Sequence, residues 1–309
     1  MNLINYCAVQ GGNFGDDINL QLWHRLFPDL SKLKGQAVFY GIGTLLDGPH
    51  DRSVRKVVLG AGIGEINSAQ PDSSWDFRWV RGPKTASEFG LSSDFGVGDP
   101  AILWPGLTEV ELQGDGPVGL IPHFATWDHF DWRSVADKAG MVAINPREAP
   151  HKVFANMRGC SQILSESLHG AICADAMGIP WAACILSHRF NEFKWNDWMA
   201  TIHRRYNPLV MHRPLVREIS PAKGWTNRIA RLVHYKRYTR HPNLRPLRVA
   251  TQEDVSAVAN TLYAFGANPY HFSCSHHRHI DRQKAAMLNR CEAFARAYDL
   301  QFEPDPKYF

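Results

Sequence analysis

Short apolar runs that end in glycines and lead into helical patterns constrain the fold of this chain more than any other feature. Leu3–Val9 runs into the turn Gly11–Asp16, and Gln162–Ser165 runs into Leu168-His169-Gly170. Alternation of strand, glycine turn and helix is typical of parallel sheets covered by helices. We therefore expect an α/β protein.

This alternation occurs twice, on either side of a cluster of turn residues near residues 111–117. The predicted strands are Leu3–Val9, Ala37–Tyr40, Lys56–Leu59 and Asp76–Val80 in the first half, and Val118–Ile121, Met141–Ile144, Gln162–Ser165 and Trp181–Ile185 in the second. The predicted helices are Asp17–Phe27, Lys84–Phe89 and Gly170–Met177, and then two more, one after the capping box at Thr251–Asp254 and one over His279–Leu300. We therefore predict two Rossmann-like halves that face each other across a cleft. They form an N-terminal domain (1–115) and a C-terminal domain with the donor site (116–250), followed by a helical extension (251–309).

The bulk composition is that of a globular protein outside the membrane. Of the 309 residues, 44% are hydrophobic and 21% are charged. No run of 18 apolar residues predicts a membrane span, and the first residues carry no basic leader, so we expect a cytoplasmic protein. The six cysteines are scattered without a Cys-x-x-Cys pair, which predicts buried, reduced thiols.

Positive charge is concentrated late in the chain. From His203 to Arg248 there are twelve Lys and Arg but one acid, Glu218. Such a stretch suits an anionic partner, which could be a diphosphate-linked acceptor, a membrane surface or a nucleic acid, or it is a solvated basic face.

His169 is the first candidate for a catalytic group. It lies in the loop after a predicted strand, at the start of the next helix, where backbone N–H groups and the helix dipole favour an anion. Open α/β sheets bind ligands at this end of their strands. His123, after the strand that opens the second half, is an alternative, and the sequence does not decide which histidine acts as the acid.

Asp16 is the matching candidate in the first half. Asn13, Gly15 and Asp16 follow the first strand, and the glycine permits close approach of a ligand to the backbone. Asp16 is either the N-cap of the helix or a general base that points into the cleft.

Five short motifs resemble those of the polysaccharide pyruvyl transferase family, in the family's order. They are Asn13–Asp16, Arg81–Thr85, Gly98-Asp99-Pro100, Ile121–Phe124 and Ser167–Gly170 with its downstream Gly178-Ile179-Pro180. The resemblance covers about residues 10–200 and is nearest to the ketal pyruvyltransferases of succinoglycan and xanthan. Many members carry Arg where this chain has Ser167, so a donor contact made by that Arg must come from elsewhere.

The resemblance implies a fold similar to the GT-B glycosyltransferases, phosphoenolpyruvate as the donor and a lipid-linked oligosaccharide as the acceptor. Ketal formation then needs a general acid, a base that activates hydroxyls and a clamp for phosphate. The expected catalytic residues are His169, Asp16 and His123, and the expected donor-binding residues are Arg81, Lys84, Ser167, Leu168, Gly170, Asn13 and Gly15. The resemblance implies no cofactor and no nucleic acid, and it leaves room for a peripheral association with the inner membrane.

The segment from Phe190 to Trp198 mixes aromatic and polar side chains. Sugar rings stack on Trp, so Trp195, Asp197 and Trp198 are candidates for acceptor binding, with core packing as the alternative. The histidines near Cys274 are expected to be surface groups and not a metal site.

Two other functions share these features. A GT-B glycosyltransferase that uses a nucleotide sugar would have the same fold and basic cleft, and a non-catalytic carbohydrate-binding protein could use the aromatic segment. Release of phosphate from phosphoenolpyruvate that depends on the acceptor separates all three.

Overall fold

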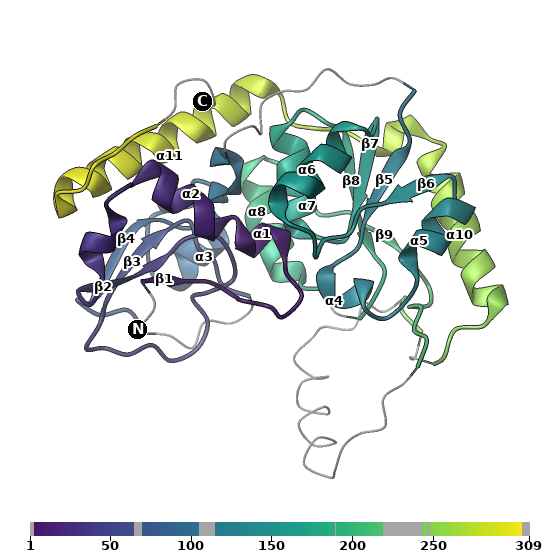
Figure 1. Ribbon diagram of the computed structural model, residues 1–309, viewed down its shortest axis with the longest axis horizontal. Coiled ribbons are helices and arrows are strands. Elements are labelled where there is room, and N and C mark those ends of the chain that lie inside the picture. Colours follow the sequence, from purple (N-terminus) through teal and green to yellow (C-terminus); the bar gives the residue numbers. More distant parts are fainter. Residues whose placement is uncertain are drawn as a thin grey trace, which may run out of the picture.

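The computed structural model describes residues 3–64, 70–104, 115–188, 190–218, 243–245 and 248–304. It contains two parallel β-sheets, one in each half of the chain, and the two halves lie side by side (Figure 1). The predicted α/β class is confirmed, and the arrangement is consistent with two Rossmann-like halves.

The N-terminal half holds a four-stranded sheet in the order β1-β2-β3-β4. Its strands are β1 (Ile4–Asn5), β2 (Ala37–Tyr40), β3 (Arg55–Leu59) and β4 (Trp75–Trp79). Its helices are α1 (Phe14–Asp17), α2 (Asn19–Leu26) and α3 (Pro83–Glu88), with 3-10 turns η1 (Leu30–Leu33), η2 (Ser93–Phe95) and η3 (Pro100–Leu103). Strands β2 and β3 are almost wholly buried, as continuous apolar strands covered on both faces should be.

The C-terminal half holds a five-stranded sheet in the order β6-β5-β7-β8-β9. Its strands are β5 (Val118–Ile121), β6 (Met141–Ala143), β7 (Gln162–Ser165), β8 (Trp181–Ile185) and β9 (Leu209–Val210). Its helices are α4 (Phe124–Trp127), α5 (Trp132–Lys138), α6 (Pro150–Arg158), α7 (Leu168–Ala176) and α8 (Glu192–Thr201). Because β5 and β7 are adjacent and parallel, the loops after them, which carry His123 and His169, lie at one edge of the sheet.

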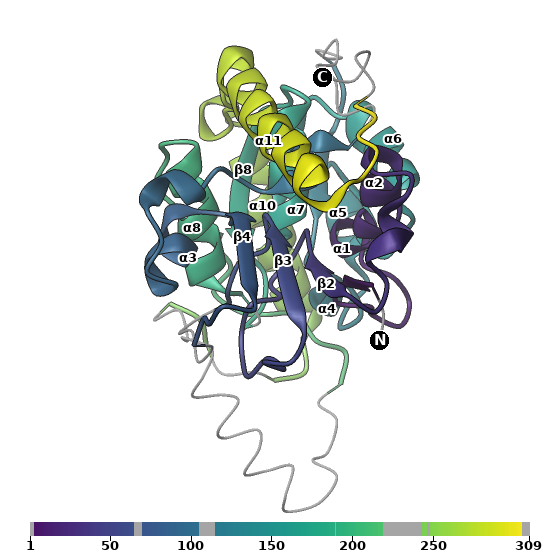
Figure 2. The ribbon, with the colours of Figure 1, turned by 90° about the vertical axis from the view of Figure 1, so that its left-hand side faces the viewer.

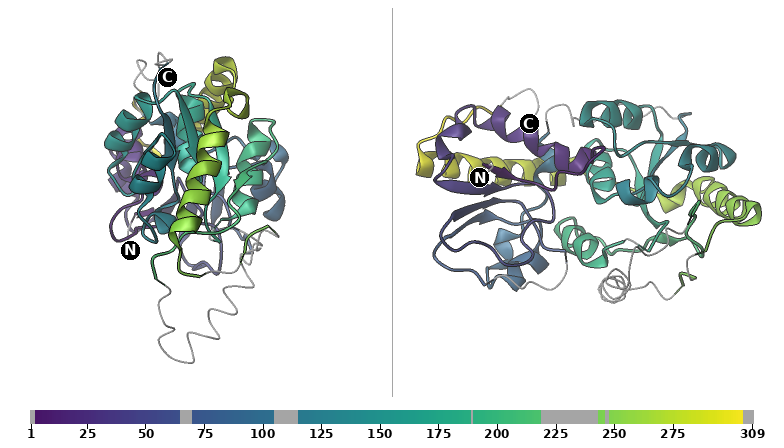
Figure 3. Two further views of the ribbon diagram at one scale, coloured as in Figure 1. Left: turned by 90° about the vertical axis from the view of Figure 1, so that its right-hand side faces the viewer. Right: turned by 60° about the horizontal axis from the view of Figure 1, so that its bottom comes forward.

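The last two helices pack on different halves. Helix α10 (Gln252–Gly266) begins with the predicted Thr251–Asp254 capping box and lies against α5 on the outer side of the C-terminal half (Figures 1 and 3). After the turn η4 (Pro269–His271), helix α11 (His277–Tyr298) returns to the N-terminal sheet (Figure 2). There the Phe294 ring lies edge-on to Phe27, with 5.1 Å between ring centroids. The prediction that residues 251–309 form a separate helical extension stays a prediction.

Most predicted boundaries lie within two residues of the observed ones, and the larger differences are at the start of the chain. Four strands, β2, β5, β7 and β8, match their predicted ranges to the residue. The predicted strand Leu3–Val9 is wrong in length, because only Ile4 and Asn5 pair with β2. The predicted helix Asp17–Phe27 is wrong at its start, because helical structure begins at Phe14, whose N–H donates to the Pro146 carbonyl at 3.0 Å.

The halves meet along three pairs of elements, α1 with α6, α3 with α8, and η3 with α7. The first turn of the N-terminal half is therefore brought to the carboxyl edge of the second sheet. Among the described residues, no helix has both the length and the apolar character needed to cross a membrane. Four of the six cysteines are buried as predicted, whereas Cys7 is exposed.

Candidate functional site

His169 lies in the first turn of α7, where the sequence predicted it. Strand β7 ends at Ser165, whose hydroxyl donates to the Ser167 carbonyl at 2.7 Å, and the helix begins one residue later. A side chain on Gly170 would collide with that hydroxyl, so only glycine fits the turn. The N–H groups of the first turn of a helix lack intrahelical partners, and such a helix end favours an anion. The Leu168 side chain belongs to the core, so its role in donor binding, which stays a prediction, would fall to its backbone.

The imidazole of His169 lies between the two halves of the protein. A Cβ atom on Gly15 would overlap the ring at Nδ1, so the first turn of α1 packs directly on the histidine. On the other side, His169 Nε2 lies 3.6 Å from Oδ2 of Asp99. The predicted residues Gly15 and His169, which are 154 positions apart in the sequence, are thus in contact.

Asp16 lies beside this pair and is itself buried. The Asn13 side-chain amide donates to Asp16 Oδ2, and a Cβ on Gly43, in the loop after β2, would lie 2.5 Å from Asp16 Oδ1. Burial raises the pKa of Asp16 to about 6, while His169 and Lys194 oppose that rise. A carboxyl group with a pKa near the working pH suits a general base.

Lys194, on α8, is a functional candidate that sequence reasoning missed. Burial is the largest cause that lowers the pKa of Lys194 to about 8, followed by the charge of Arg81, while Asp16 and Glu166 favour the charged form. Within the described part of the chain its ammonium group has no hydrogen-bond or ion-pair partner. The signal available in the sequence is a lone cation inside an aromatic segment. The aromatic residues of that segment favour acceptor binding, and the lysine between them is easily overlooked.

All three guanidinium nitrogens of Arg81 donate hydrogen bonds within the protein. Its Nε donates to Asp197 Oδ2 at 3.2 Å, its Nη2 donates to the Ile63 carbonyl at 2.7 Å and its Nη1 donates to the Thr44 hydroxyl at 3.3 Å. Asp197 also accepts from the hydroxyl and the N–H of Thr85. With 1% of the arginine and none of the aspartate exposed, this pair joins the loop between β4 and α3 to α8 across the halves. Donor binding by Arg81 stays a prediction, and the structure gives it an internal role.

The tryptophans of the aromatic segment are also internal. Trp195 and Trp198 are 1% and 2% exposed and pack around Trp181. A sugar ring needs an open indole face, which neither tryptophan offers in this arrangement. Lys84 is exposed on α3, and no described contact brings it to His169 or Asp16.

His123 occupies the carboxyl end of β5, as expected. Its Nδ1 accepts from the Ala125 N–H at 3.3 Å and caps α4, and its N–H donates to Glu166 at 3.1 Å. Glu166 also accepts from the N–H groups of Leu186 and Ser187, and burial raises its pKa. This carboxylate ties together the loops after β5, β7 and β8, and it fixes the edge of the sheet from which His169 projects.

Two other regions lie apart from these residues. The histidines near Cys274 have separate partners, since His279 contacts the Thr201 carbonyl and His276 caps α11. Across the described ranges no three His, Cys, Asp or Glu side chains gather to hold a metal ion.

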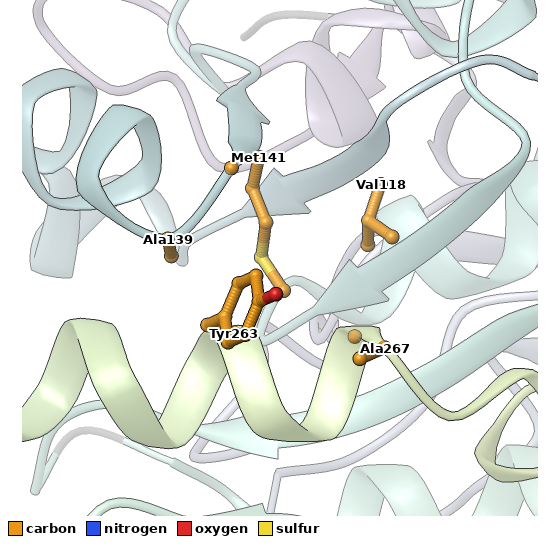
Figure 4. Close-up of a pocket in the computed structure, with 7 residues that line it drawn as sticks. Val118, Ala139, Met141, Tyr263 and Ala267 are labelled. Atoms are coloured by element: carbon orange, nitrogen blue, oxygen red, sulfur yellow. The ribbon is translucent and has the colours of Figure 1, made fainter.

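A pocket of about 160 Å³ lies between α10 and the amino ends of β5 and β6, lined by Val118, Met141 and Tyr263 (Figure 4). It is at the opposite end of the sheet from His169.

Comparison with known proteins assigns the chain to a family. The family model for polysaccharide pyruvyl transferase matches residues 2–188, more than half of the chain. The protein belongs to the polysaccharide pyruvyl transferase family. The matched residues include Asp16, Asp99 and His169.

One relative of the chain takes part in the biosynthesis of an exopolysaccharide. Over 209 residues the chain is 37% identical to the succinoglycan biosynthesis protein ExoV of Rhizobium meliloti (strain 1021), and the match spans 66% of each chain. The chain is thus related to a protein of exopolysaccharide biosynthesis. Residues 189–309 lie outside the family match, so Lys194 and α11 rest on the structure alone.

Proposed function

We propose that this protein moves pyruvate from phosphoenolpyruvate onto two hydroxyls of one sugar in a lipid-linked exopolysaccharide repeat unit. The reaction takes place between two halves in a GT-B-like arrangement, at the inner face of the cytoplasmic membrane. The proposal is supported by one observation: Asp16, on α1 of one half, interacts electrostatically with His169, which lies in the first turn of α7 in the other half. An acid and a base on opposite sides of one anion site are what ketal formation requires.

Two groups hold the donor, and Arg81 supports them indirectly. Phosphoenolpyruvate carries a phosphate and a carboxylate, and the first turn of α7, from Ser167 to Gly170, offers N–H groups to one of them. Lys194 supplies the positive charge, because its ammonium group has no partner among the described residues. Arg81, whose guanidinium is occupied by Asp197, acts on the site by joining the loop between β4 and α3 to α8.

The chemistry then follows in balanced steps. His169 gives a proton to the methylene carbon of the donor, which leaves an oxocarbenium-like centre at C2. A sugar hydroxyl attacks C2 and loses its proton to Asp16; the C2–O bond to phosphate breaks and phosphate leaves with the electron pair. The second hydroxyl attacks the same carbon, loses its proton to the now neutral His169 and closes the ring, which restores the acid. The products are one cyclic ketal and one phosphate.

The lipid-linked acceptor suggests a role for the basic stretch from His203 to Arg248. Two of its described arginines, Arg213 and Arg248, are already paired with Asp254. Lys236, Arg237 and Arg240, the positions best suited to contact an anionic membrane surface, lie outside the described residues, and peripheral membrane association stays a prediction. Binding to anionic vesicles that weakens steeply with salt supports it, because surface charges are screened over about 10 Å at 0.1 M salt.

The proposed function is tested by following phosphate. Phosphoenolpyruvate should release phosphate when a lipid-linked glycan is present and stay intact when the glycan is left out. Consumption of a nucleotide sugar in place of phosphoenolpyruvate would indicate a glycosyltransferase and contradict the proposal.

The rate should depend on pH through Asp16 and Lys194. Asp16 must be ionised to accept a proton, so kcat/KM for phosphoenolpyruvate should rise as the pH passes about 6. Lys194 must be protonated to hold the anion, so kcat/KM should fall as the pH passes about 8. The two limbs belong to the coupled site as a whole. A profile that is flat through both limbs contradicts these roles, and in Lys194→Arg the alkaline limb should move to higher pH.

Lys194→Met should raise KM for phosphoenolpyruvate by about 10-fold or more, because a hydrogen bond to a charged group contributes about 1.5–3 kcal/mol. Steady-state kinetics with the donor varied measure the effect. Lys84→Met is the matched control and should leave this KM within about twofold. If Lys84→Met raises the donor KM and Lys194→Met does not, the donor lies at α3.

A further inference from the structure

A second carboxylate, that of Asp99, lies beside His169, and one of its two oxygens faces the imidazole ring. Asp99 Oδ2 and His169 Nε2 are both sealed from solvent, and neither has a hydrogen bond within the described part of the chain. They lie 3.6 Å apart, which is an ion-pair distance but too long for a hydrogen bond. A buried oxygen and a buried nitrogen without partners are costly, unless they serve each other.

The turn that carries Asp99 is held rigidly. Asp99 Oδ1 accepts from the Ala101 N–H at 2.9 Å and caps η3, and Trp79 Nε1 donates to the Gly98 carbonyl at 3.2 Å. Gly98 has a φ of +139°, and a side chain there would collide with Met287 of α11. Gln283, also on α11, donates to the Val97 carbonyl at 3.2 Å. Asp99 is only 1% exposed, and the turn that carries it is fixed on both sides, so the carboxylate stays directed at His169.

The two ring nitrogens of His169 therefore face different surroundings. Nε2 faces the Asp99 carboxylate, while Nδ1 lies on the side of Gly15, where the two halves meet. A carboxylate next to one nitrogen favours a proton on that nitrogen and stabilises the imidazolium form. The other nitrogen is then the one that exchanges a proton with the substrate.

We propose that Asp99 is a positioning residue that holds the proton of neutral His169 on Nε2, stabilises its charged form and leaves Nδ1 to deliver the proton to the donor. This inference rests on the proposed function for the role of His169 as the acid. It goes further by assigning the tautomer, the nitrogen that reacts and the residue that sets both.

Other charged groups act on His169 as well. Asp16 faces it from α1, with Asp17 next to it, and Lys194 acts from α8 through Asp16. Within α7, Cys173 lies near Asp99, and burial raises the pKa of that thiol so that it stays neutral. Asp99 is the one of these groups within ion-pair distance of the ring.

The test measures the protonation of the His169 imidazole directly. In the full-length protein with ¹⁵N-labelled histidine, two-bond ¹H–¹⁵N spectra report the tautomer and the pKa of each imidazole, and the His169 signal is assigned by its loss in His169→Gln. We expect the neutral ring of the wild-type protein to carry its proton on Nε2. In Asp99→Asn, which keeps the oxygen that caps η3, an amide N–H donor replaces the carboxylate oxygen beside Nε2, so the proton of the neutral ring should move toward Nδ1. In the same variant kcat should drop by about 10²- to 10⁴-fold, with little change in the donor KM.

Asp94→Asn, a change at a nearby turn, is the control and should leave the spectrum and kcat unchanged. A neutral His169 that carries its proton on Nδ1 in the wild-type protein overturns the inference. Because this measurement needs no variant, the inference can be tested even if Asp99→Asn does not fold. An unchanged tautomer and an unchanged kcat in folded Asp99→Asn overturn it too. If His169→Gln keeps full activity although the Asp99 signature is present, the proposed function fails and the pairing stands.

Discussion

His169→Ala is expected to lower kcat for pyruvyl transfer by about 10²- to 10⁴-fold, the usual contribution of a general acid or base. The variant should fold, because His169 projects from a helix end toward Gly15 and its ring is outside the apolar core. Steady-state rates of phosphate release, with both substrates saturating, measure the effect. Thermal unfolding of the same preparation establishes that the fold is intact.

The matched control is His151→Ala, which removes an exposed histidine from α6. It should leave kcat and the unfolding temperature unchanged. If folded His169→Ala turns over at the wild-type rate, the acid lies elsewhere, and His123, at the end of the adjacent strand β5, is the residue to replace next.

Asp197→Ala is expected to lower the free energy of unfolding by about 3–5 kcal/mol, because it leaves the guanidinium of Arg81 buried without its counter-charge. The same change removes the acceptor for the Thr85 hydroxyl, which now donates to Asp197 at 2.6 Å. Denaturant unfolding followed by tryptophan fluorescence measures the loss, since Trp195 and Trp198 flank this position on α8.

Glu292→Ala, which breaks the exposed pair with Arg296 on α11, is the control and should cost no more than about 1 kcal/mol. The result that contradicts our account is an Asp197→Ala protein of unchanged stability with a raised KM for the sugar. That outcome would return Asp197 to the acceptor site predicted from the sequence.

The contrast between His169 and Arg81 shows what the sequence could reveal. The position of His169 follows from local signals alone, an apolar strand, a turn and a helix pattern, and the structure confirms each of them. The partner of Arg81 is 116 residues away in the chain, on a helix that the sequence did not predict. An exposed arginine and a buried, paired arginine look the same in a sequence, because only the tertiary fold brings the carboxylate to it.

The same limit explains Lys194 and α11. The aromatic side chains around Lys194 suggested a sugar-binding surface, yet helix α8 turns the tryptophans inward, and among the described residues the Lys194 ammonium group has no hydrogen-bond or ion-pair partner. The amphipathic pattern of α11 was visible, but the surface that it covers was not. Its return to the N-terminal sheet depends on long-range contacts such as that between Phe294 and Phe39, whose ring centroids are 5.8 Å apart.

The central claim is that the donor carbon is protonated and then bonded to two sugar oxygens. Mass alone does not test it, since a cyclic ketal and a singly attached enolpyruvyl ether both add one pyruvate less one water. The decisive measurement is the NMR spectrum of the product formed from phosphoenolpyruvate and the glycan in D₂O. Our account predicts a CH₂D group on a quaternary carbon that is bonded to two sugar oxygens. A product that retains a vinyl group, or a methyl group without deuterium, would contradict it.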